Sequence, residues 1–389
     1  MLKQRKAYQF RMEPTDLESD ELLRMAGTPR FVWNWALYRC QTFYRQNKKS
    51  IPPSQLSREL TEFKSQQPWL YDFDSQSLQQ VLENLRQAYR NHFNPKMRSG
   101  FPKFKTKKNP RQSFRIPQRV VVREGKVYVP KLGWVKIRQS QPIEEATKSA
   151  TFKRTATGQW YVTLISEFEV SEGKQPVTQV VGGDLGLETF LTLSDGTPPI
   201  ENPRFLRQYA KRLRRAQRHL SRKQKGSRNR AQARLGVAKV YERVANLRSN
   251  FCHQLTHQLM QYPAVCLEDL SILGLAKTKL AKSMLDAAFG EVLRQWKYKS
   301  VWNGTYALQA DRFFPSTQLC SACGYQNPKL RLCDREWICP GCETQHRRDQ
   351  NAAQNLEDEG IRQLVAMGRI ETVNACGRYV RPAVAGHVG

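Results

Sequence analysis

Two pairs of cysteines near the C-terminal end constrain this chain more than any other feature. Cys320 and Cys323 form the first pair, Cys339 and Cys342 form the second, and fifteen residues separate the two pairs. This is the spacing of a tetrahedral thiolate site for zinc, in which four soft ligands leave no position open for substrate. We therefore predict one structural Zn²⁺ bound by these four cysteines.

The other five cysteines do not form pairs of this kind. They are Cys40, Cys252, Cys266, Cys333 and Cys376. Such scatter suits ordinary buried thiols better than a disulfide framework. Cys333 lies between the two pairs but has no partner, so we expect it to stay outside the zinc site.

The charge of the chain indicates a polyanionic partner. Its 389 residues contain 64 Lys and Arg but only 34 Asp and Glu, which gives a net charge of +30. A membrane surface could also attract this charge, but no segment approaches the roughly 18 apolar residues of a spanning helix, and the N-terminus lacks an apolar signal core. We therefore expect a cytoplasmic protein that binds nucleic acid, long enough for two or three cores.

The N-terminal half reads as helices followed by strands. An apolar stripe through Leu78, Leu82 and Leu85 predicts a helix, with Ser75 as its N-cap, inside a small helical domain. Alternating residues and glycine turns from about 100 to 175 favour an antiparallel barrel or meander. We interpret Trp33 and Trp35 as core residues.

Basic residues gather in two parts of the chain. One is a loop in which Lys103 and Lys105 alternate with phenylalanines, as in grooves that bind a nucleic-acid backbone and stack its bases. The other is 203–250, where two helices broken near Gly226 carry many cations and one acid. We expect phosphate contacts from both, in particular from Lys103, Lys105, Arg212, Arg215, Arg222, Lys223, Arg230 and, further on, Arg348.

Three acids lie where they could meet. Asp184 and Glu268 each end an apolar strand, and Asp349 begins a helix. Carboxylates converging from neighbouring strands suit two Mg²⁺ or Mn²⁺ ions about 4 Å apart, which catalyse phosphodiester hydrolysis. Taken singly, each acid also fits a turn cap, an ion pair or a helix N-cap. Asp195 and Asp269 are neighbours with the same chemistry.

Several motifs in the same order closely resemble TnpB, the RNA-guided nuclease family of insertion sequences that is related to type V CRISPR effectors. The resemblance spans nearly the whole chain. It includes Gly183-Asp184-Leu185-Gly186, Leu267-Glu268-Asp269-Leu270, Arg312-Phe313-Phe314-Pro315-Ser316 and Arg348-Asp349-Gln350-Asn351-Ala352-Ala353-Gln354-Asn355.

The resemblance implies an α+β multidomain fold. Its core would be a RuvC-like, RNase H-type nuclease with a zinc-ribbon insert, joined to a helical recognition domain and a wedge-like antiparallel β-barrel. The implied boundaries are 1–15 for the first barrel strand, 16–98 for the recognition domain, 99–175 for the rest of the barrel, 176–315 for nuclease parts I and II with basic helices 203–250, 316–345 for the zinc ribbon that binds target nucleic acid, 346–370 for nuclease part III and 371–389 for a flexible tail.

The resemblance also implies a site and partners. Asp184, Glu268 and Asp349 would be the catalytic, Mg²⁺-binding acids, and among them Glu268 is preferred over its neighbour on this ground alone. The partners would be a guide RNA from the transposon end and double-stranded DNA with a flanking motif, met in the prokaryotic cytoplasm or nucleoid. Arg347 departs from the family, which often has an acid there. His346 is expected beside the catalytic site.

The sequence therefore predicts an RNA-guided, Mg²⁺-dependent DNA endonuclease. Two other classes remain open at this point. One is an RNA-guided repressor that has lost cleavage, although all three acids are present. The other is an acidic-triad transposase or junction resolvase, since such carboxylates also serve strand transfer and junction cutting.

Overall fold

The computed structural model describes residues 2–97, 99–109, 111–170, 176–331 and 333–370, and the expected tail at 371–389 lies outside them. The chain forms two compact units, which we treat separately. The N-terminal unit is Lys3–Glu169, and the C-terminal unit is formed by Val170–Gly389 with Met1–Leu2. No helix in the described residues is both long and apolar enough to cross a membrane.

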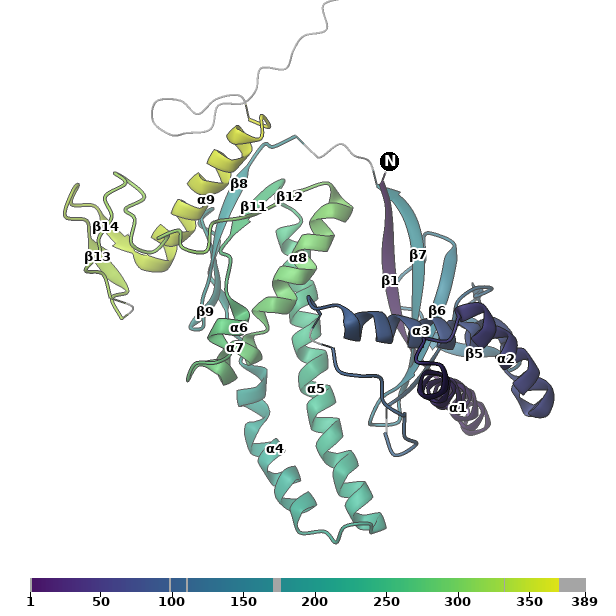
Figure 1. Ribbon diagram of the computed structural model, residues 1–389. Coiled ribbons are helices and arrows are strands. Elements are labelled where there is room, and N and C mark those ends of the chain that lie inside the picture. Colours follow the sequence, from purple (N-terminus) through teal and green to yellow (C-terminus); the bar gives the residue numbers. More distant parts are fainter. Residues whose placement is uncertain (1, 98, 110, 171–175, 332, 371–389) are drawn as a thin grey trace, which may run out of the picture. The chain divides into compact units, whose positions relative to one another are not determined.

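Helices form one layer of the N-terminal unit (Figure 1). They are α1 (Asp16–Asn47), α2 (Pro53–Gln66), the short 3-10 helix η1 (Pro68–Asp72) and α3 (Ser75–Phe93). The first begins at a capping box between Thr15 and Glu18, which satisfies two free backbone N–H groups. The α3 helix is confirmed, but its predicted cap is wrong by one residue, because Asp74 accepts the N–H of Ser77.

The strands of this unit form one seven-stranded sheet. They are β1 (Leu2–Met12), β2 (Gln112–Ile116), β3 (Val122–Arg123), β4 (Lys126–Val129), β5 (Gly133–Arg138), β6 (Thr147–Arg154) and β7 (Trp160–Val170). The order is β2-β6-β7-β1-β5-β4-β3, so the N-terminal strand β1 lies between β7 and β5, which come more than a hundred residues later in the sequence. In the described residues β2 and β3 are the two ends of this order.

A five-stranded sheet organises the C-terminal unit. It contains β8 (Val180–Leu185), β9 (Thr189–Leu193), β10 (Ile200–Glu201), β11 (Ala264–Leu267) and β12 (Tyr306–Gln309), in the order β10-β9-β8-β11-β12. Strand β11 pairs in parallel with both β8 and β12, whereas β9 is antiparallel to β8. The carboxyl ends of β8 and β11 therefore lie at the same edge of the sheet.

Helices cover both faces of this sheet. On one face α9 (Arg348–Ala366) packs its leucines against the core residues Val180, Cys266 and Leu308. The other face is covered by α5 (Arg228–Leu259), α7 (Ala281–Ala287) and α8 (Phe289–Asn303), near the one-turn helix α6 (Ile272–Leu275). Figure 1 shows α9 and α8 on opposite sides of the strands.

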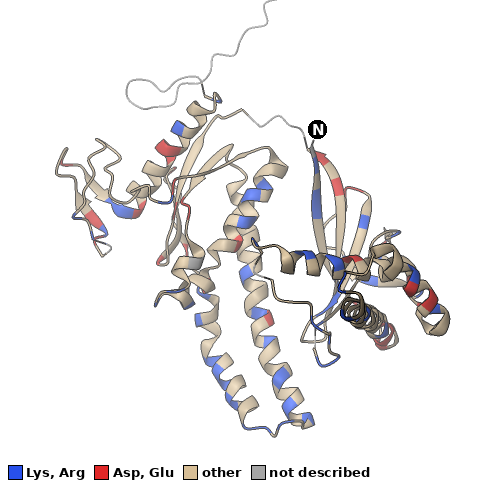
Figure 2. Ribbon diagram, viewed as in Figure 1, with Lys and Arg blue, Asp and Glu red and all other residues tan. Residues whose placement is uncertain are grey.

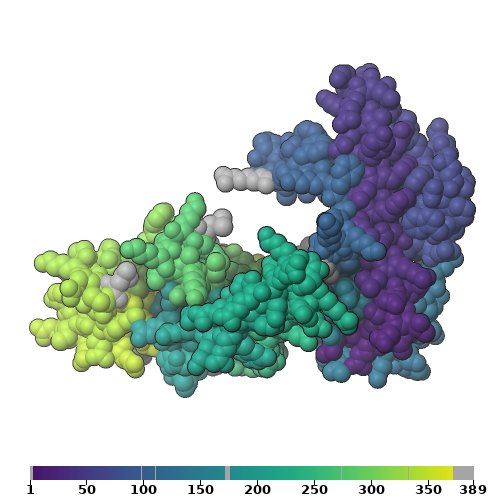
Figure 3. Space-filling view, turned by 90° about the horizontal axis from the view of Figure 1, so that it is seen from below, coloured from purple at the N-terminus to yellow at the C-terminus, as the bar shows by residue number. Residues whose placement is uncertain are grey.

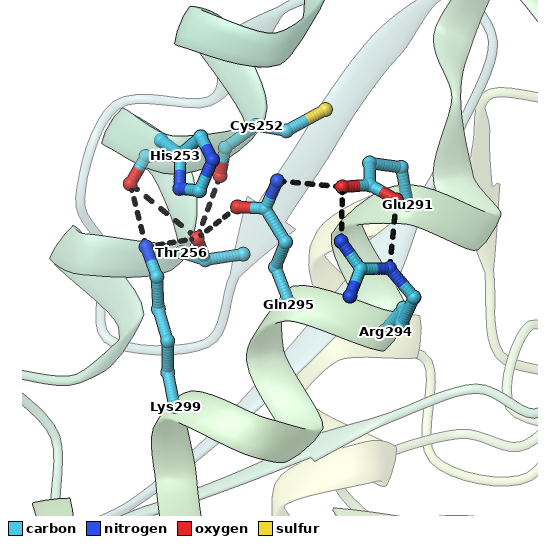
Figure 4. A network of polar contacts seen from close by, with 7 residues as sticks. All are labelled: Cys252, His253, Thr256, Glu291, Arg294, Gln295 and Lys299. Atoms are coloured by element: carbon cyan, nitrogen blue, oxygen red, sulfur yellow. Dashed lines mark hydrogen bonds and ion pairs between the residues drawn. The ribbon is translucent and has the colours of Figure 1, made fainter. Parts of the chain in front are cut away.

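A buried polar network joins α5 to α8 (Figure 4). The Thr256 hydroxyl donates to the Cys252 carbonyl at 2.7 Å and can also donate to the Gln295 side chain at 3.1 Å. Lys299 donates to the same hydroxyl, and Gln295 donates to Glu291. Cys252 is an ordinary buried thiol, as expected, and burial raises its pKa to about 11, which disfavours the reactive thiolate form.

The basic segment forms a helical hairpin of α4 (Phe205–Ser221) and α5, and the predicted break is confirmed, since Ser227 caps α5. Figure 2 shows Lys and Arg repeated along both helices, and in Figure 3 the hairpin is an elongated teal ridge. No residue of α4 is fully buried. The hairpin therefore presents its cations to solvent, whereas α5 continues into the core.

Candidate active site

The sheet register brings the first two acids together. Gly182 pairs with Cys266 and Gly183 with Leu267, so one further step along the parallel pair places Asp184 beside Glu268. Since side chains alternate between faces, both acids share the face of Gly182, which α9 covers. The predicted convergence of these two carboxylates is therefore a consequence of strand pairing.

The third acid comes from α9, which lies very close to β8. A Cβ on Gly182 would overlap backbone atoms of Ala353 and Glu357, and a Cβ on Gly360 would crowd Val180, the first residue of β8. Gly360 therefore packs toward the starts of the strands, and the first turn of α9 points toward their carboxyl ends. That turn contains Asp349.

The electrostatics show that the three acids interact. Burial raises the pKa of Asp184 well above its usual range, and repulsion by Glu268 and Asp349 raises it further. The guanidinium groups of Arg348 and Arg335 oppose this shift. Burial also raises the pKa of Glu268. The hydrogen bond that Glu268 accepts from the Ser316 hydroxyl lowers this pKa but does not cancel the effect of burial. The site is thus a concentration of negative charge that a cation would stabilise.

Partners distinguish Glu268 from the adjacent acid. The Ser316 hydroxyl donates to Glu268 Oε1 at 2.6 Å, whereas Asp269 is paired with Arg312 at 2.6 Å. Ser316 and Arg312 belong to one of the motifs that resemble the family, but no role for either was predicted from the sequence. The structure shows that this loop after β12 supports the end of β11.

Two arginines contact Asp349. Arg335 Nη1 lies 3.5 Å and Arg348 Nη2 lies 3.4 Å from its Oδ1 atom. Arg335 also pairs with the exposed Glu188, and its carbonyl accepts the N–H of Arg348 at 2.8 Å. Arg335 was missed because it lies between the cysteine pairs without a recognisable motif. The exposed Arg347, at the departure from the family, belongs to β14 (Gln345–Arg347).

The four predicted thiols form one cluster. Their sulfur atoms all lie within 4.8 Å of one another, and both Cys320–Cys342 and Cys323–Cys339 are 3.6 Å apart. Zinc–sulfur bonds of about 2.3 Å in a tetrahedron place sulfurs about 3.8 Å apart, so the cluster has the dimensions of a zinc site. Cys333 lies outside it, with its thiol 3.6 Å from Asp334 Oδ1.

The segment with these cysteines also contains the hairpin of β13 (Glu336–Ile338) and β14, and two buried asparagines hold it to α9. The amides of Asn351 and Asn355 both donate to the Leu319 carbonyl, at 2.6 and 2.8 Å. Asn351 Oδ1 accepts the N–H of Ser321 at 2.9 Å. Since Leu319 precedes the first cysteine, the thiol cluster and the helix that bears Asp349 form one connected structure.

The expected position of His346 is wrong. Its ring is buried, its Nε2 lies 3.0 Å from Cys320 Sγ, and it packs against Trp337 with ring centroids 4.9 Å apart. Because β14 alternates its side chains, His346 faces the thiols while the next residue faces away. It therefore belongs to the cysteine cluster, not to the carboxylates.

The predicted nucleic-acid residues of the N-terminal unit lie on a fixed loop. The indole of the buried Trp33 donates to the Lys103 carbonyl at 3.0 Å, and Lys105 Nζ lies 3.8 Å from the Trp33 ring centroid. Asn34 bonds both backbone groups of Lys105. Both lysines are exposed, and the core interpretation of Trp33 is confirmed, while Trp35 stacks on Phe63 at 4.8 Å.

The other predicted cations differ in their freedom. Arg212, Arg215 and Arg222 are exposed on the basic hairpin, and Lys223 is half-buried at its turn. Arg230 instead donates to the carbonyls of Leu220 and Lys223, at 3.0 and 2.7 Å. Its guanidinium therefore ties the turn together, and Arg348, as described above, belongs to the carboxylate site.

Family models match three segments of the chain. Residues 163–279 match a family described as "Probable transposase", residues 289–356 match the "Cas12f1-like, TNB domain", and residues 1–49 match a helix-turn-helix domain. The first two matches include all three acids and all four clustered cysteines.

Two curated relatives match almost end to end. The chain is 36% identical to a "Putative RNA-guided DNA endonuclease" of Streptomyces pristinaespiralis, covering 97% of this chain and 92% of that protein. It is 32% identical to "Putative RNA-guided DNA endonuclease InsQ" of Escherichia coli K12, covering 98% and 96%. This protein therefore belongs to the TnpB family, which confirms the resemblance seen in its motifs.

A solved structure shares the fold. The cryo-EM structure of a Cas12f1–sgRNA–target DNA complex contains a chain that aligns with a TM-score of 0.55 at 13% identity, covering 88% of this chain and 83% of that one. At this identity the likeness concerns the fold alone, and it supports the predicted α+β multidomain class.

Proposed function

We propose that this protein is an RNA-guided DNA endonuclease of an insertion sequence, which cuts target DNA beside a short flanking motif by two-metal-ion hydrolysis. Its near-full-length relatives bear the name of such endonucleases and support this function over a repressor, a transposase or a resolvase. The observation that carries the proposal is the register of β8 and β11, which sets Asp184 beside Glu268 where α9 delivers Asp349.

The proposed core is RuvC-like, of the RNase H type. Its support is the mixed sheet, in which β8, β11 and β12 run parallel, β9 runs antiparallel, and helices cover both faces. For the remaining parts we propose the boundaries given above: a wedge-like barrel containing β1, a recognition domain at 16–98, and a zinc-ribbon insert at 316–345.

The carboxylates fit hard divalent cations such as Mg²⁺ or Mn²⁺. They are oxygen ligands, and burial together with their mutual repulsion raises the pKa of Asp184. When bound, Mg²⁺ would polarise the phosphodiester and supply a hydroxide nucleophile.

The chain's own residues would then orient this site. Ser316 fixes one oxygen of Glu268, and the first turn of α9 fixes Asp349. Arg335 and Arg348 bring positive charge to the acids before a cation binds, and the exposed Arg335 could turn toward a phosphate of the DNA strand. Soft thiolates of Cys320, Cys323, Cys339 and Cys342 would hold a closed, structural Zn²⁺.

Guide RNA and DNA are the proposed partners. The net charge of +30 and the exposed cations of α4 and α5 supply the phosphate-binding surface, with Arg212, Arg215 and Arg222 favoured over Arg230, which is occupied inside the turn. Lys103 and Lys105 would contribute from their fixed loop. Such partners are met in the bacterial cytoplasm, at the nucleoid when DNA is bound.

Purified protein with its copurifying RNA tests the function directly. The RNA is sequenced, and a DNA library with a matched target beside random flanking bases is incubated with the complex and Mg²⁺. We expect double-strand breaks that depend on the guide and on one flanking motif. Binding without cutting would favour the repressor, joined strands the transposase, and cutting indifferent to guide sequence the resolvase.

A further inference from the structure

Phe313 lies beside the carboxylate site in an unusual state for a large apolar residue. It is 87% exposed, the highest value among large apolar side chains in the described part of the chain. The next residue, Phe314, packs against the core beneath α9. Single exposed apolar residues are common, so exposure alone does not indicate a binding site. The residues around Phe313 distinguish it from the others.

The loop holds Phe313 in a fixed place. Its N–H donates to Asp311 Oδ1 at 2.9 Å, and the N–H of Phe314 donates to the Asp311 carbonyl at 3.0 Å. Just before this turn, the N–H of Ala310 donates to the Leu267 carbonyl at 3.0 Å, at the end of β11. These bonds preorganise the backbone, so little entropy is lost when the ring binds a partner.

Both flanks of Phe313 contact the end of β11. On one side Arg312 pairs with Asp269, and on the other Ser316 donates to Glu268. A recess of about 260 Å³ is lined by Glu268 together with the residues before and after Phe313. The exposed ring is therefore anchored within a few residues of a proposed catalytic carboxylate.

We propose that Phe313 stacks on an unpaired DNA base next to the phosphate that the acids receive. A base offers a flat apolar face and leaves the neighbouring charged groups in water, which fits a ring surrounded by Asp311, Arg312 and Asp269. An apolar protein segment would bury those charges at a cost. Single-strand sites combine such an aromatic platform with nearby cations. The inference rests on the proposed function and adds a subsite to it.

The test uses the full RNA–protein complex carrying Asp184→Asn, so that bound DNA stays intact. The fluorescent base 2-aminopurine is moved one position at a time through a single-stranded target, and quenching and affinity are measured. We expect strong quenching at one position, lost in Phe313→Ala with affinity about tenfold weaker, because the stacking contact with the base is removed.

Two further variants separate stacking from simple apolar contact. Phe313→Tyr retains a flat ring and is expected to behave like the Phe313 protein. Phe313→Leu retains bulk without a π-face and is expected to behave like Phe313→Ala. Equal quenching in all four proteins, or normal binding by the leucine variant, would overturn the stacking role.

The same proteins with Asp184 intact distinguish failure of the Phe313 subsite from failure of the proposed endonuclease function. If Phe313→Ala and Phe313→Leu cut matched DNA with a raised KM and a position-specific loss of quenching, while Phe313→Tyr does not, the subsite stands. If the Asp184 protein cuts no matched DNA at all, the proposed function fails irrespective of Phe313. If it cuts and Phe313→Ala changes neither KM nor quenching, only the subsite fails.

Discussion

The thiol cluster and the carboxylate cluster are built in opposite ways. The four cysteines lie between residues 320 and 342, within one segment, and their sulfurs converge within 4.8 Å. The three acids span residues 184 to 349 and meet only through the pairing of β8 with β11 and the packing of α9. A local turn can make the first site, whereas the second requires the whole core, so a change in the core should be able to disrupt the carboxylate site while zinc stays bound.

Asp184→Asn should cause the largest loss. The change removes a carboxylate that the proposed ions need, and several kcal/mol of transition-state stabilisation correspond to a loss of about a thousandfold or more in cutting. Zinc content should not change. Asp195→Asn is the matched control: this acid follows the neighbouring strand, accepts the Tyr262 hydroxyl, and should alter cutting by less than about twofold. Equal losses in both variants would contradict the assignment.

Gly182→Ala should disrupt the carboxylate site through packing. An added Cβ meets the backbone of α9, and relief of such a clash costs about 2 kcal/mol or more. We expect a lower Tm and a large loss of cutting, with four-thiol zinc binding retained, as measured by thermal unfolding and metal analysis. Gly236→Ala in α5, where an added Cβ meets nothing within 4 Å, should leave Tm unchanged or higher. Loss of zinc in Gly182→Ala would show that the sites are not separable.

Cys339→Ser should instead remove zinc and weaken cutting only indirectly. It removes a zinc ligand from a buried position, and because the segment is bonded to α9, cutting should fall by about tenfold to a hundredfold through misplacement of Asp349. Cys333→Ser should retain zinc and cutting, since its thiol lies outside the cluster. Zinc loss in the second variant would overturn the ligand assignment, and unchanged cutting after zinc loss in the first would break the connection to Asp349.

Asn355→Ala should have the smallest of these effects. Its buried amide donates to the carbonyls of Ser316 and Leu319, and leaving such groups unpaired costs about 1–3 kcal/mol. We expect a lower Tm and a severalfold loss of cutting with zinc still bound. Gln354→Ala, which removes an exposed contact to Ser321, should stay close to the unaltered protein. If both variants behave alike, the amide connection does not link the two sites.

The thiol cluster could be predicted from the sequence more completely than the carboxylate cluster. The thiol cluster could be predicted because CxxC spacing is a local constraint, and the family could be recognised because its motifs survive in order. His346 was misplaced because strand alternation in β14 decides which site it faces. The roles of Arg335 and Ser316 could not be predicted, because their partners, Asp349 and Glu268, come close to them only after folding. Arg230 was grouped with surface cations since composition does not reveal that its guanidinium is used inside a turn.

The sequence by itself determined the positive charge that indicates a nucleic-acid partner and the four thiols of one metal site. It also determined which three acids, Asp184, Glu268 and Asp349, are candidates for the second site. Only the tertiary structure decided which acids meet, what holds each one, and that Asp269 is occupied by Arg312 while Glu268 is not. The physical reason is distance along the chain. Spacing of a few residues fixes local geometry, but carboxylates more than a hundred residues apart converge only through strand register and close helix packing.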